Sequence, residues 1–462
     1  MKKYIIVILI LISPLFWKGM GGEVFAQSTI WQSYGSGLAI NWGIRYLHAV
    51  DANTVWAIGS HGASTTASNK FTKTGNGASF TSGTFLADTN TFNATSICAL
   101  DSNTAFISIY DKAANGTSGQ ILRTTNSGIN WTNIASPSMF LNTNNFPDFV
   151  YFWDMSNGIA VGDPNGHTNT ATTIQEFEIW RTIDSAHTWV RVKDSLLPPP
   201  LSNEYGLSNS YAVYGQKVWF GTTKGRVYTS IDSGKWVAYS TGLLGGANGL
   251  AFRDSLHGIA WGFENTTTQK ITVMNTSNGG HTWTPAPTNL AIGTKDFCII
   301  PGTYGYMSVG LNGETVGAYA TSKTYNEGTS WAVLESNTLN IENISAVQMI
   351  DTLHGWAGTK TTNNTTGMNK YIGNNLAGIN QFIIQNSEFI IYPNPSNGLF
   401  NLTISQFDNA SIEIFNMMGA SVHRQIITSS NSLIDVSNLA AGVYILKFQS
   451  GNTHQVQKLI IQ

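Results

Sequence analysis

The chain has 462 residues, of which 11% are charged, and a formal net charge of −2. This balance gives no electrostatic basis for binding nucleic acid or an anionic membrane surface. The charged fraction is far below the quarter that is usual in globular proteins, and Asn, Thr, Ser and Gly take the place of the missing charges. The composition therefore favours an exported, turn-rich all-β protein.

The N-terminus has the pattern of a secretion signal. Lys2 and Lys3 precede an apolar run from Tyr4 to Trp17, and small residues before Gln27 fit a signal-peptidase site. The run is short for a bilayer span, and we find no second one. We expect residues 1–26 to be removed on export, which leaves no transmembrane segment in the mature chain. The alternative is an uncleaved N-terminal anchor.

A turn that ends in an aromatic residue recurs roughly every 50 residues. Its pattern is Thr-x-Asp/Asn-x-Gly followed three residues later by Trp, and the copy that ends at Trp236 is one residue shorter. We expect the Asp or Asn to accept backbone N–H bonds two residues on, Gly to supply a positive φ, and the Trp to pack between neighbouring sheets. The aromatic positions are Phe80, Trp131, Trp189, Trp236, Trp283 and Trp331, and the acidic turn positions are Asp184 and Asp232.

A second repeated element lies between these turns. It is an apolar run, a polar turn such as Asp51-Ala52-Asn53 or Asp351-Thr352-Leu353, and a second apolar run, which is typical of a β-hairpin. Seven such hairpins occur, and the last has no aromatic turn after it. We expect the N-terminal strand around Trp31 to complete that last unit. Together the repeats predict a seven-bladed β-propeller over residues 27–375, closed by Trp31 so that no sheet edge is left bare.

The aromatic turns resemble Asp-box (BNR) repeats, over about residues 28–375. Such repeats occur in sialidases, xyloglucanases, sortilin-type receptors and photosystem II assembly-factor propellers. The resemblance implies the propeller fold but says little about function, because the turn is structural and is shared by unrelated activities.

The character of the sequence changes after a short linker at 376–387. Residues 388–462 show alternating strands separated by Gly and Asn turns, which predicts a small β-sandwich. This segment resembles the type A C-terminal sorting domain of the Bacteroidota type IX secretion system. The matching positions are Tyr392, Pro393, Asn394, Pro395, Gly398, Gly442, Tyr444 and Lys458. The resemblance implies the type IX secretion machinery as a partner and a location at the outer cell surface or in the medium.

Long loops in the third repeat contain the strongest acidic candidates for a site. Asp163 opens one polar excursion and Glu204 lies in the loop that follows Pro198-Pro199-Pro200. Two carboxylates across a cleft are what glycoside hydrolysis needs. The alternative is structural, with Asp163 as a solvated turn residue and Glu204 as an exposed loop residue.

No other chemistry is indicated. The histidines recur with the repeat or stand alone, so we expect no metal site and no cofactor. Cys98 and Cys298 fall in inner strands of non-adjacent blades, and we expect buried free thiols. The favoured hypothesis is a non-catalytic module that binds a surface glycan or protein. The alternatives are a glycoside hydrolase with a site near the loops of blades 3 and 4, and an assembly factor.

Overall fold

The computed structural model describes residues 28, 30–62, 66–86, 91–112, 118–141, 146–164, 176–230, 234–263, 271–286, 292–311, 319–337, 343–360, 366–376, 389–404, 410–416, 419–427, 429, 431–450 and 453–462. The expected signal peptide, most of the expected linker and Asp232 lie outside these residues. The chain divides into two compact units, Met1–Gly378 and Ile379–Gln462. Each unit is described by itself.

The first unit consists of four-stranded antiparallel sheets, here called blades 1 to 7. Seven are present between Trp31 and Tyr371 in the described part of the chain. Blade 1 is β2 (Trp42–Ala49), β3 (Val55–His61), β4 (Lys70–Thr74) and β5 (Thr81–Thr84); blade 2 is β6 (Phe92–Ala99), β7 (Ala105–Asp111), β8 (Gln120–Thr124) and β9 (Thr132–Asn133); blade 3 is β10 (Pro147–Phe152), β11 (Gly158–Pro164), β12 (Phe177–Thr182) and β13 (Val190–Arg191).

The remaining blades follow the same order. Blade 4 is β14 (Gly206–Tyr214), β15 (Lys217–Thr222), β16 (Arg226–Ser230) and β17 (Trp236–Ser240), and a 3-10 turn (Asp194–Leu196) precedes it; blade 5 is β18 (Gly249–Phe252), β19 (Gly258–Phe263), β20 (Ile271–Thr276) and β21 (Thr284–Pro285). Blade 6 is β22 (Asp296–Ile300), β23 (Gly305–Leu311), β24 (Tyr319–Thr324) and β25 (Ala332–Asn337); blade 7 is β26 (Ile344–Met349), β27 (Gly355–Thr359), β28 (Gly367–Tyr371) and β1 (Trp31–Gly35).

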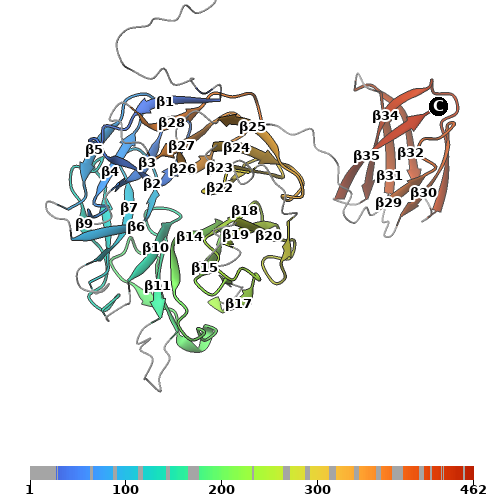
Figure 1. The fold of residues 1–462 in the computed structure, drawn as a ribbon. Helices are drawn as coiled ribbons and strands as arrows, with labels where there is room; N and C mark the ends of the chain where they lie inside the picture. Colours follow the sequence, from blue (N-terminus) through green and yellow to red (C-terminus); the bar gives the residue numbers. More distant parts are fainter. Residues whose placement is uncertain are drawn as a thin grey trace, which may run out of the picture. The chain divides into compact units, whose positions relative to one another are not determined.

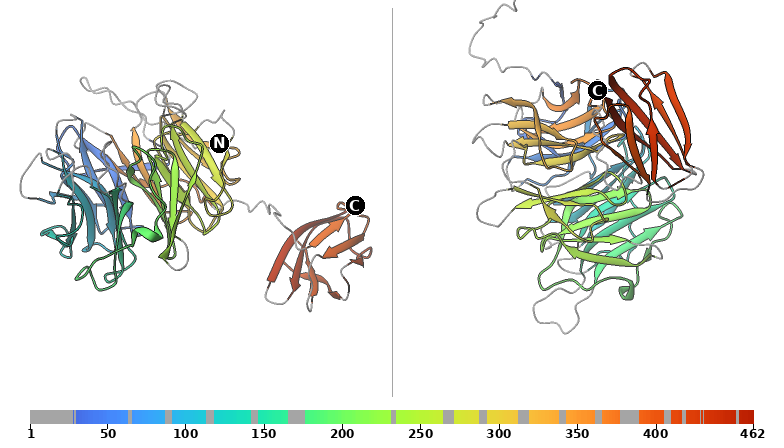
Figure 2. Two further views of the ribbon diagram at one scale, coloured as in Figure 1. Left: turned by 90° about the horizontal axis from the view of Figure 1, so that it is seen from below. Right: turned by 90° about the vertical axis from the view of Figure 1, so that its right-hand side faces the viewer.

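The blades form a closed ring around their inner strands (Figures 1 and 2). Each inner strand contacts the inner strand of the next blade, and β26 of blade 7 contacts β2 of blade 1. The ring is joined by the N-terminal strand, because β1 pairs with β28 from Trp31↔Tyr371 to Gly35↔Gly367. Trp31 is 3% exposed, and its Nε1 donates to Thr321 Oγ1 of blade 6 at 3.1 Å. The predicted propeller and the predicted closure by the Trp31 strand are confirmed.

The aromatic turns share one hydrogen-bond pattern. In the turn after β20, Thr276 Oγ1 accepts from Gly280 N at 3.0 Å, and Asn278 Oδ1 accepts from Thr282 N at 3.0 Å. Asp184 likewise accepts from Thr188 N at 2.9 Å. The Asp or Asn side chain therefore accepts from the backbone N–H four residues on, whereas the sequence predicted the N–H two residues on. The difference arises because the Thr hydroxyl accepts the nearer N–H, that of Gly280.

The predicted positive φ is present in these turns. It is +95° at Gly280 and +74° at Gly328, while Ala186 adopts +63° in the copy that lacks glycine. The aromatic rings pack within and between blades: Trp131 lies 6.1 Å from Trp56 of blade 1 between ring centroids, and Phe80 lies 5.7 Å from Trp356 of blade 7. These contacts connect the turn pattern in the sequence to the packing of neighbouring sheets.

The second unit has two sheets. One has the order β29 (Phe389–Tyr392), β30 (Leu399–Ile404) and β33 (Asn431–Asp435); the other has the order β32 (Ser421–Ile427), β31 (Ala410–Phe415), β34 (Gly442–Ser450) and β35 (Thr453–Ile461). Both sheets contribute to one buried core, for example Phe400 and Ile434 from the first and Ile412 and Phe448 from the second. This is the small β-sandwich that the sequence predicts.

The residues of the C-terminal motif hold the ends of this sandwich together. Asn394 donates through Nδ2 to Lys458 O at 2.6 Å and accepts from Ile460 N at 2.8 Å. Gly398 has a φ of +94°, and Tyr444 donates its hydroxyl to Ala440 O at 2.8 Å. Tyr392, Pro393 and Pro395 lie around the first turn, and Gly442 begins β34. The motif therefore ties the opening turn to the last strand.

Candidate functional site

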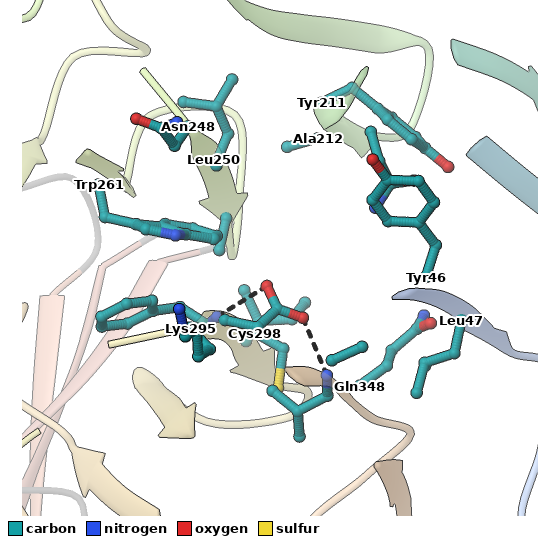
Figure 3. A pocket seen from close by; sticks show the side chains of 18 of the residues that line it. Tyr46, Leu47, Tyr211, Ala212, Asn248, Leu250, Trp261, Lys295, Cys298 and Gln348 are labelled. Carbon is teal, nitrogen blue, oxygen red and sulfur yellow. Dashed lines mark hydrogen bonds between the residues drawn. The ribbon is translucent and has the colours of Figure 1, made fainter. Parts of the chain in front are cut away.

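A pocket of about 470 Å³ lies in the middle of the propeller. Its walls come from the inner strands of blades 1, 4, 5, 6 and 7, with Tyr151 from blade 3 (Figure 3). The volume is within the range of small-ligand sites in proteins. Because rigid strands of several blades converge there, the pocket is a preformed candidate site.

Polar side chains line the pocket where the inner strands begin. Arg45 lies near the start of β2, Asn209 near the start of β14, and Asn248 and Lys295 immediately before β18 and β22. Asn248 and Lys295 are exposed, and Asn209 is half-buried. The inner strands of successive blades all begin on the same face of a propeller, so these groups surround one end of the pocket. We call the pocket the central channel and this end its mouth.

Aromatic residues form much of the wall below this mouth. Tyr46 and Tyr211 lie on one side of the pocket, with Trp261 across from them (Figure 3). Tyr151 stands near Tyr211, with ring centroids 6.1 Å apart. Burial raises the pKa of Tyr151 to about 12 and raises that of Tyr211 as well. The tyrosine hydroxyls are thus neutral at physiological pH and can donate or accept hydrogen bonds.

Asp296 is the single carboxylate among the residues that line the described pocket. Its Oδ1 accepts from Phe297 N and its Oδ2 from Val347 N, both at 2.9 Å. The bond from Val347 connects blade 6 to blade 7. Burial raises the pKa of Asp296 to about 7 in spite of both bonds, so this group changes charge near neutral pH.

Two cations, Lys295 and Arg45, line the pocket, and a third, Lys360, interacts electrostatically with Lys295. Lys295 belongs to blade 6, Lys360 follows β27 of blade 7, and Arg45 belongs to blade 1. Partial loss of water around its side chain, and then repulsion from Lys360, lowers the pKa of Lys295. Lys295 forms no ion pair with any residue that the structure describes, whereas Arg45 lies over the Tyr46 ring at 5.0 Å. An anion at this mouth would relieve the repulsion between the two lysines.

The two acidic candidates from the sequence lie away from this pocket. Asp163 is in β11 of blade 3 and 1% exposed, and Glu204 precedes β14 of blade 4 and is 0% exposed. Neither lines the pocket. The fold does bring them to the same boundary, since Asp163 Oδ1 accepts from Gly206 N at 2.7 Å, two residues after Glu204.

Glu204 is held by structural partners. It accepts from Arg226 Nε at 3.0 Å, Leu201 N at 2.7 Å and Thr222 Oγ1 at 2.6 Å. The interpretation of Asp163 and Glu204 as solvated loop residues is therefore wrong, because both are buried. Neither carboxylate is open to a substrate in this structure.

The sequence did not single out the pocket residues. Lys295, Asn248 and Asn209 lie outside both repeated elements. Lys295 and Asn248 are in connections before β22 and β18, and Asn209 is in β14. The one feature of the sequence that could have pointed to them is their position, since each lies within or just before the first residues of an inner strand. His48, which stands alone in the sequence, also lines the pocket, and burial lowers its pKa to about 4.

Other expectations concern thiols, metals and membranes. Cys98 and Cys298 are buried and unpaired, as predicted. Among the residues that the structure describes, no three His, Cys, Asp or Glu side chains are grouped to hold a metal ion. The same residues include no helix with the length and apolarity needed to cross a membrane.

Comparison with known proteins identifies the second unit. Residues 390–462 match the family model described as the secretion system C-terminal sorting domain. No curated protein matches the chain in sequence. The match confirms the resemblance of this segment, and it indicates type IX secretion to the cell surface or the medium.

Solved structures resemble the first unit. YCF48 bound to a D1 peptide has a TM-score of 0.50 at 14% identity, covering 76% of this chain and 99% of that one. YCF48 from Cyanidioschyzon merolae has a TM-score of 0.48 at 12% identity, covering 74% and 98%. PorZ, a surface component of the type IX secretion system of Porphyromonas gingivalis, has a TM-score of 0.27 at 10% identity, covering 91% and 75%. At these identities the likeness concerns the fold alone, so the chain is a β-propeller protein that ends in a type IX secretion sorting domain.

Proposed function

We propose that the propeller is a non-catalytic binding module for an acidic glycan, taken into the mouth of its central channel. The observation that carries this proposal is the group of three cations on blades 6, 7 and 1, with Lys295 lacking an acidic partner among the described residues. Carboxylates on a sugar chain supply the missing charge. The neighbouring tyrosines and amides suit the hydroxyl groups and ring faces of sugars.

A hydrolase is the weaker candidate. Hydrolysis of a glycosidic bond by the usual route needs two carboxyl groups beside the bond. The described pocket offers only Asp296, and both oxygens of that carboxylate already accept backbone bonds. Asp163 and Glu204 are buried in structural contacts, so they do not supply a second group at this pocket.

A protein ligand is a second candidate. The specific observation is the YCF48 structure with a bound D1 peptide, whose fold this chain shares. At 14% identity this likeness does not extend to the ligand. The channel mouth would then receive a peptide carboxylate in place of a uronic acid.

The proposal includes the organisation of the whole chain. Residues 1–26 would be a cleaved signal peptide, 27–375 the Asp-box propeller, 376–387 a linker, and 388–462 the sorting domain. Export would then place the channel mouth outside the cell, where acidic polysaccharides occur.

The test is a retention assay on immobilised polysaccharides, with release of reducing ends measured in the same samples. Pectate and alginate are compared with the neutral polymers dextran and cellulose. The proposal expects retention on an acidic polymer without release, and weaker retention at higher salt. Retention on neutral polymers alone, or release of reducing ends, would refute it, and retention on none would favour a protein ligand.

A further inference from the structure

A buried pair of carboxylates lies at the boundary of blades 3 and 4, apart from the channel pocket. Asp148 and Asp163 are each 1% exposed. Neither forms an ion pair with any described residue. Taking a charged carboxylate out of water is costly unless a partner compensates it. Two such groups side by side therefore require a compensating charge or a proton.

The backbone directs these two side chains out of the regular sheet. The pairing of β10 with β11 shifts register between Pro147 and Phe149, which leaves Asp148 as the extra residue. The pairing of β11 with β12 shifts between Gly162 and Pro164, which leaves Asp163 as the extra residue. β-bulges re-aim a side chain and are a common device near functional sites.

Gly206, the first residue of β14, brings the two carboxylates together. Its N–H donates to Asp163 Oδ1 at 2.7 Å. A Cβ atom at this position would overlap the carboxylate of Asp148. Position 206 therefore has room for glycine only, and the two acidic groups face the same backbone from blade 3.

Asp148 differs from the bulge residues of other blades. Thr95 and Ser345 occupy the matching bulges of β6 and β26. Thr95 bonds Ser108, and Ser345 donates to Ile44 O of the next blade at 2.6 Å. Both oxygens of Asp148 are buried with no hydrogen-bond partner among the described residues. An unpartnered, buried carboxylate that interacts with a second carboxylate is what a bound cation would compensate.

We propose that Asp148 and Asp163 bind a Ca²⁺ ion that joins blade 3 to blade 4. Asp148 offers two oxygens and Asp163 its Oδ2, and Ca²⁺ accepts carboxylates in one- or two-oxygen contacts with flexible geometry. Mg²⁺ requires near-ideal octahedral geometry and retains several waters, which suits a closed site less well. Water or backbone carbonyl oxygens would complete the Ca²⁺ shell.

Without a cation, the charged form of this pair is costly. Burial raises the pKa values of Asp148 and Asp163 well above the usual range of a carboxyl group. The charge of Asp163 raises the pKa of Asp148 further. Extracellular modules bind Ca²⁺ at about 10⁻⁴ to 10⁻³ M, a concentration range that a protein exported to the cell surface can meet.

The test is thermal unfolding of the full chain after EDTA treatment, with and without 10 mM CaCl₂, at pH 7.5. Because the ion binds only the folded state, we expect a rise in Tm of about 2–5 °C and about one bound Ca²⁺ per chain by atomic emission. Asp148→Asn and Asp163→Asn should abolish the rise, while Asp154→Asn, the same change at an exposed position of blade 3, should keep it.

In EDTA the Asp148→Asn chain should melt above the unaltered protein, since an uncharged amide replaces a buried carboxyl group that has no partner among the described residues. A Tm that does not respond to Ca²⁺, or responds equally in Asp148→Asn, would overturn the proposal. So would a Tm that rises from pH 8 to pH 6 without any Ca²⁺ response, because the pair would then share a proton. If neither Asn variant folds, absence of bound Ca²⁺ from the unaltered chain decides against the site.

Discussion

Single residues at the channel mouth determine what the pocket can bind. Lys295 has a lowered pKa and a cationic neighbour, while Asp296 beside it has a pKa raised to about 7. The mouth therefore becomes more positive as the pH falls through 7, because Asp296 gains a proton there. Binding of an anionic ligand should follow that change.

We expect the affinity for an acidic oligosaccharide to be several-fold higher at pH 6 than at pH 8. Asp296→Asn removes the titrating charge and should make the affinity nearly constant over this range, apart from the smaller effect of Lys295. His48 does not add to the change, because its pKa of about 4 lies below the range. Fluorescence titration at three pH values measures the effect, and an unchanged pH profile in Asp296→Asn would contradict it.

We expect Glu204 to stabilise the fold rather than to bind a ligand, because its carboxylate is held by Leu201, Thr222 and Arg226. Breaking a buried ion pair by removing one partner costs about 3–5 kcal/mol, so Glu204→Gln should lower the free energy of unfolding by about 3 kcal/mol and leave ligand affinity unchanged. Asp194→Asn is the control, because Asp194 is exposed and its partner Arg191 is only half-buried, and a pair near the surface is worth about 0–1 kcal/mol. Urea unfolding of both variants gives the comparison. Full stability with lost binding would place Glu204 in the site instead.

At the scale of the element, the sequence determined the blades better than the pocket. Trp31, Phe80 and the later aromatic positions predict the repeat because a turn reuses the same local bonds wherever it occurs. The pocket depends on connections such as Thr294 and Lys295 before β22, which belong to neither repeat. Their role follows from where the strand ends meet in space. The burial of Asp163 could not be predicted either, because it depends on a bulge in β11 and on Gly206 of the next blade.

The closing strand β1 supplies a prediction of its own. Trp31 is buried between blades 6 and 7, and truncation of a buried Trp costs about 3–5 kcal/mol. Trp31→Ala should lower the free energy of unfolding by that amount, while Gln32→Ala, on the exposed side of the same strand, should change it by less than about 0.5 kcal/mol. Equal effects in the two variants would mean that β1 does not close the ring.

At the scale of the whole molecule, the proposed binding site and the sorting domain lie in separate units. Among the described residues, the core cluster of the second unit runs from Ile391 to Ile461. A chain ending at residue 387 should keep the melting temperature and ligand affinity of the propeller, but a type IX secretion host should no longer export it. Calorimetry tests whether the melting temperature and the affinity are kept, and fractionation of the culture medium tests whether export is lost. Export of the shortened chain would contradict the role of the sorting domain.

The most direct test of the binding proposal is calorimetric titration of the full chain with the acidic oligosaccharide best retained in the polysaccharide assay. The unaltered protein should bind one molecule per chain. Lys295→Met should weaken binding at least about tenfold, equivalent to about 1.4 kcal/mol, and Lys193→Met, a lysine away from the pocket, should not. Equal affinity in all three proteins would place the ligand elsewhere and contradict a binding site at the channel mouth.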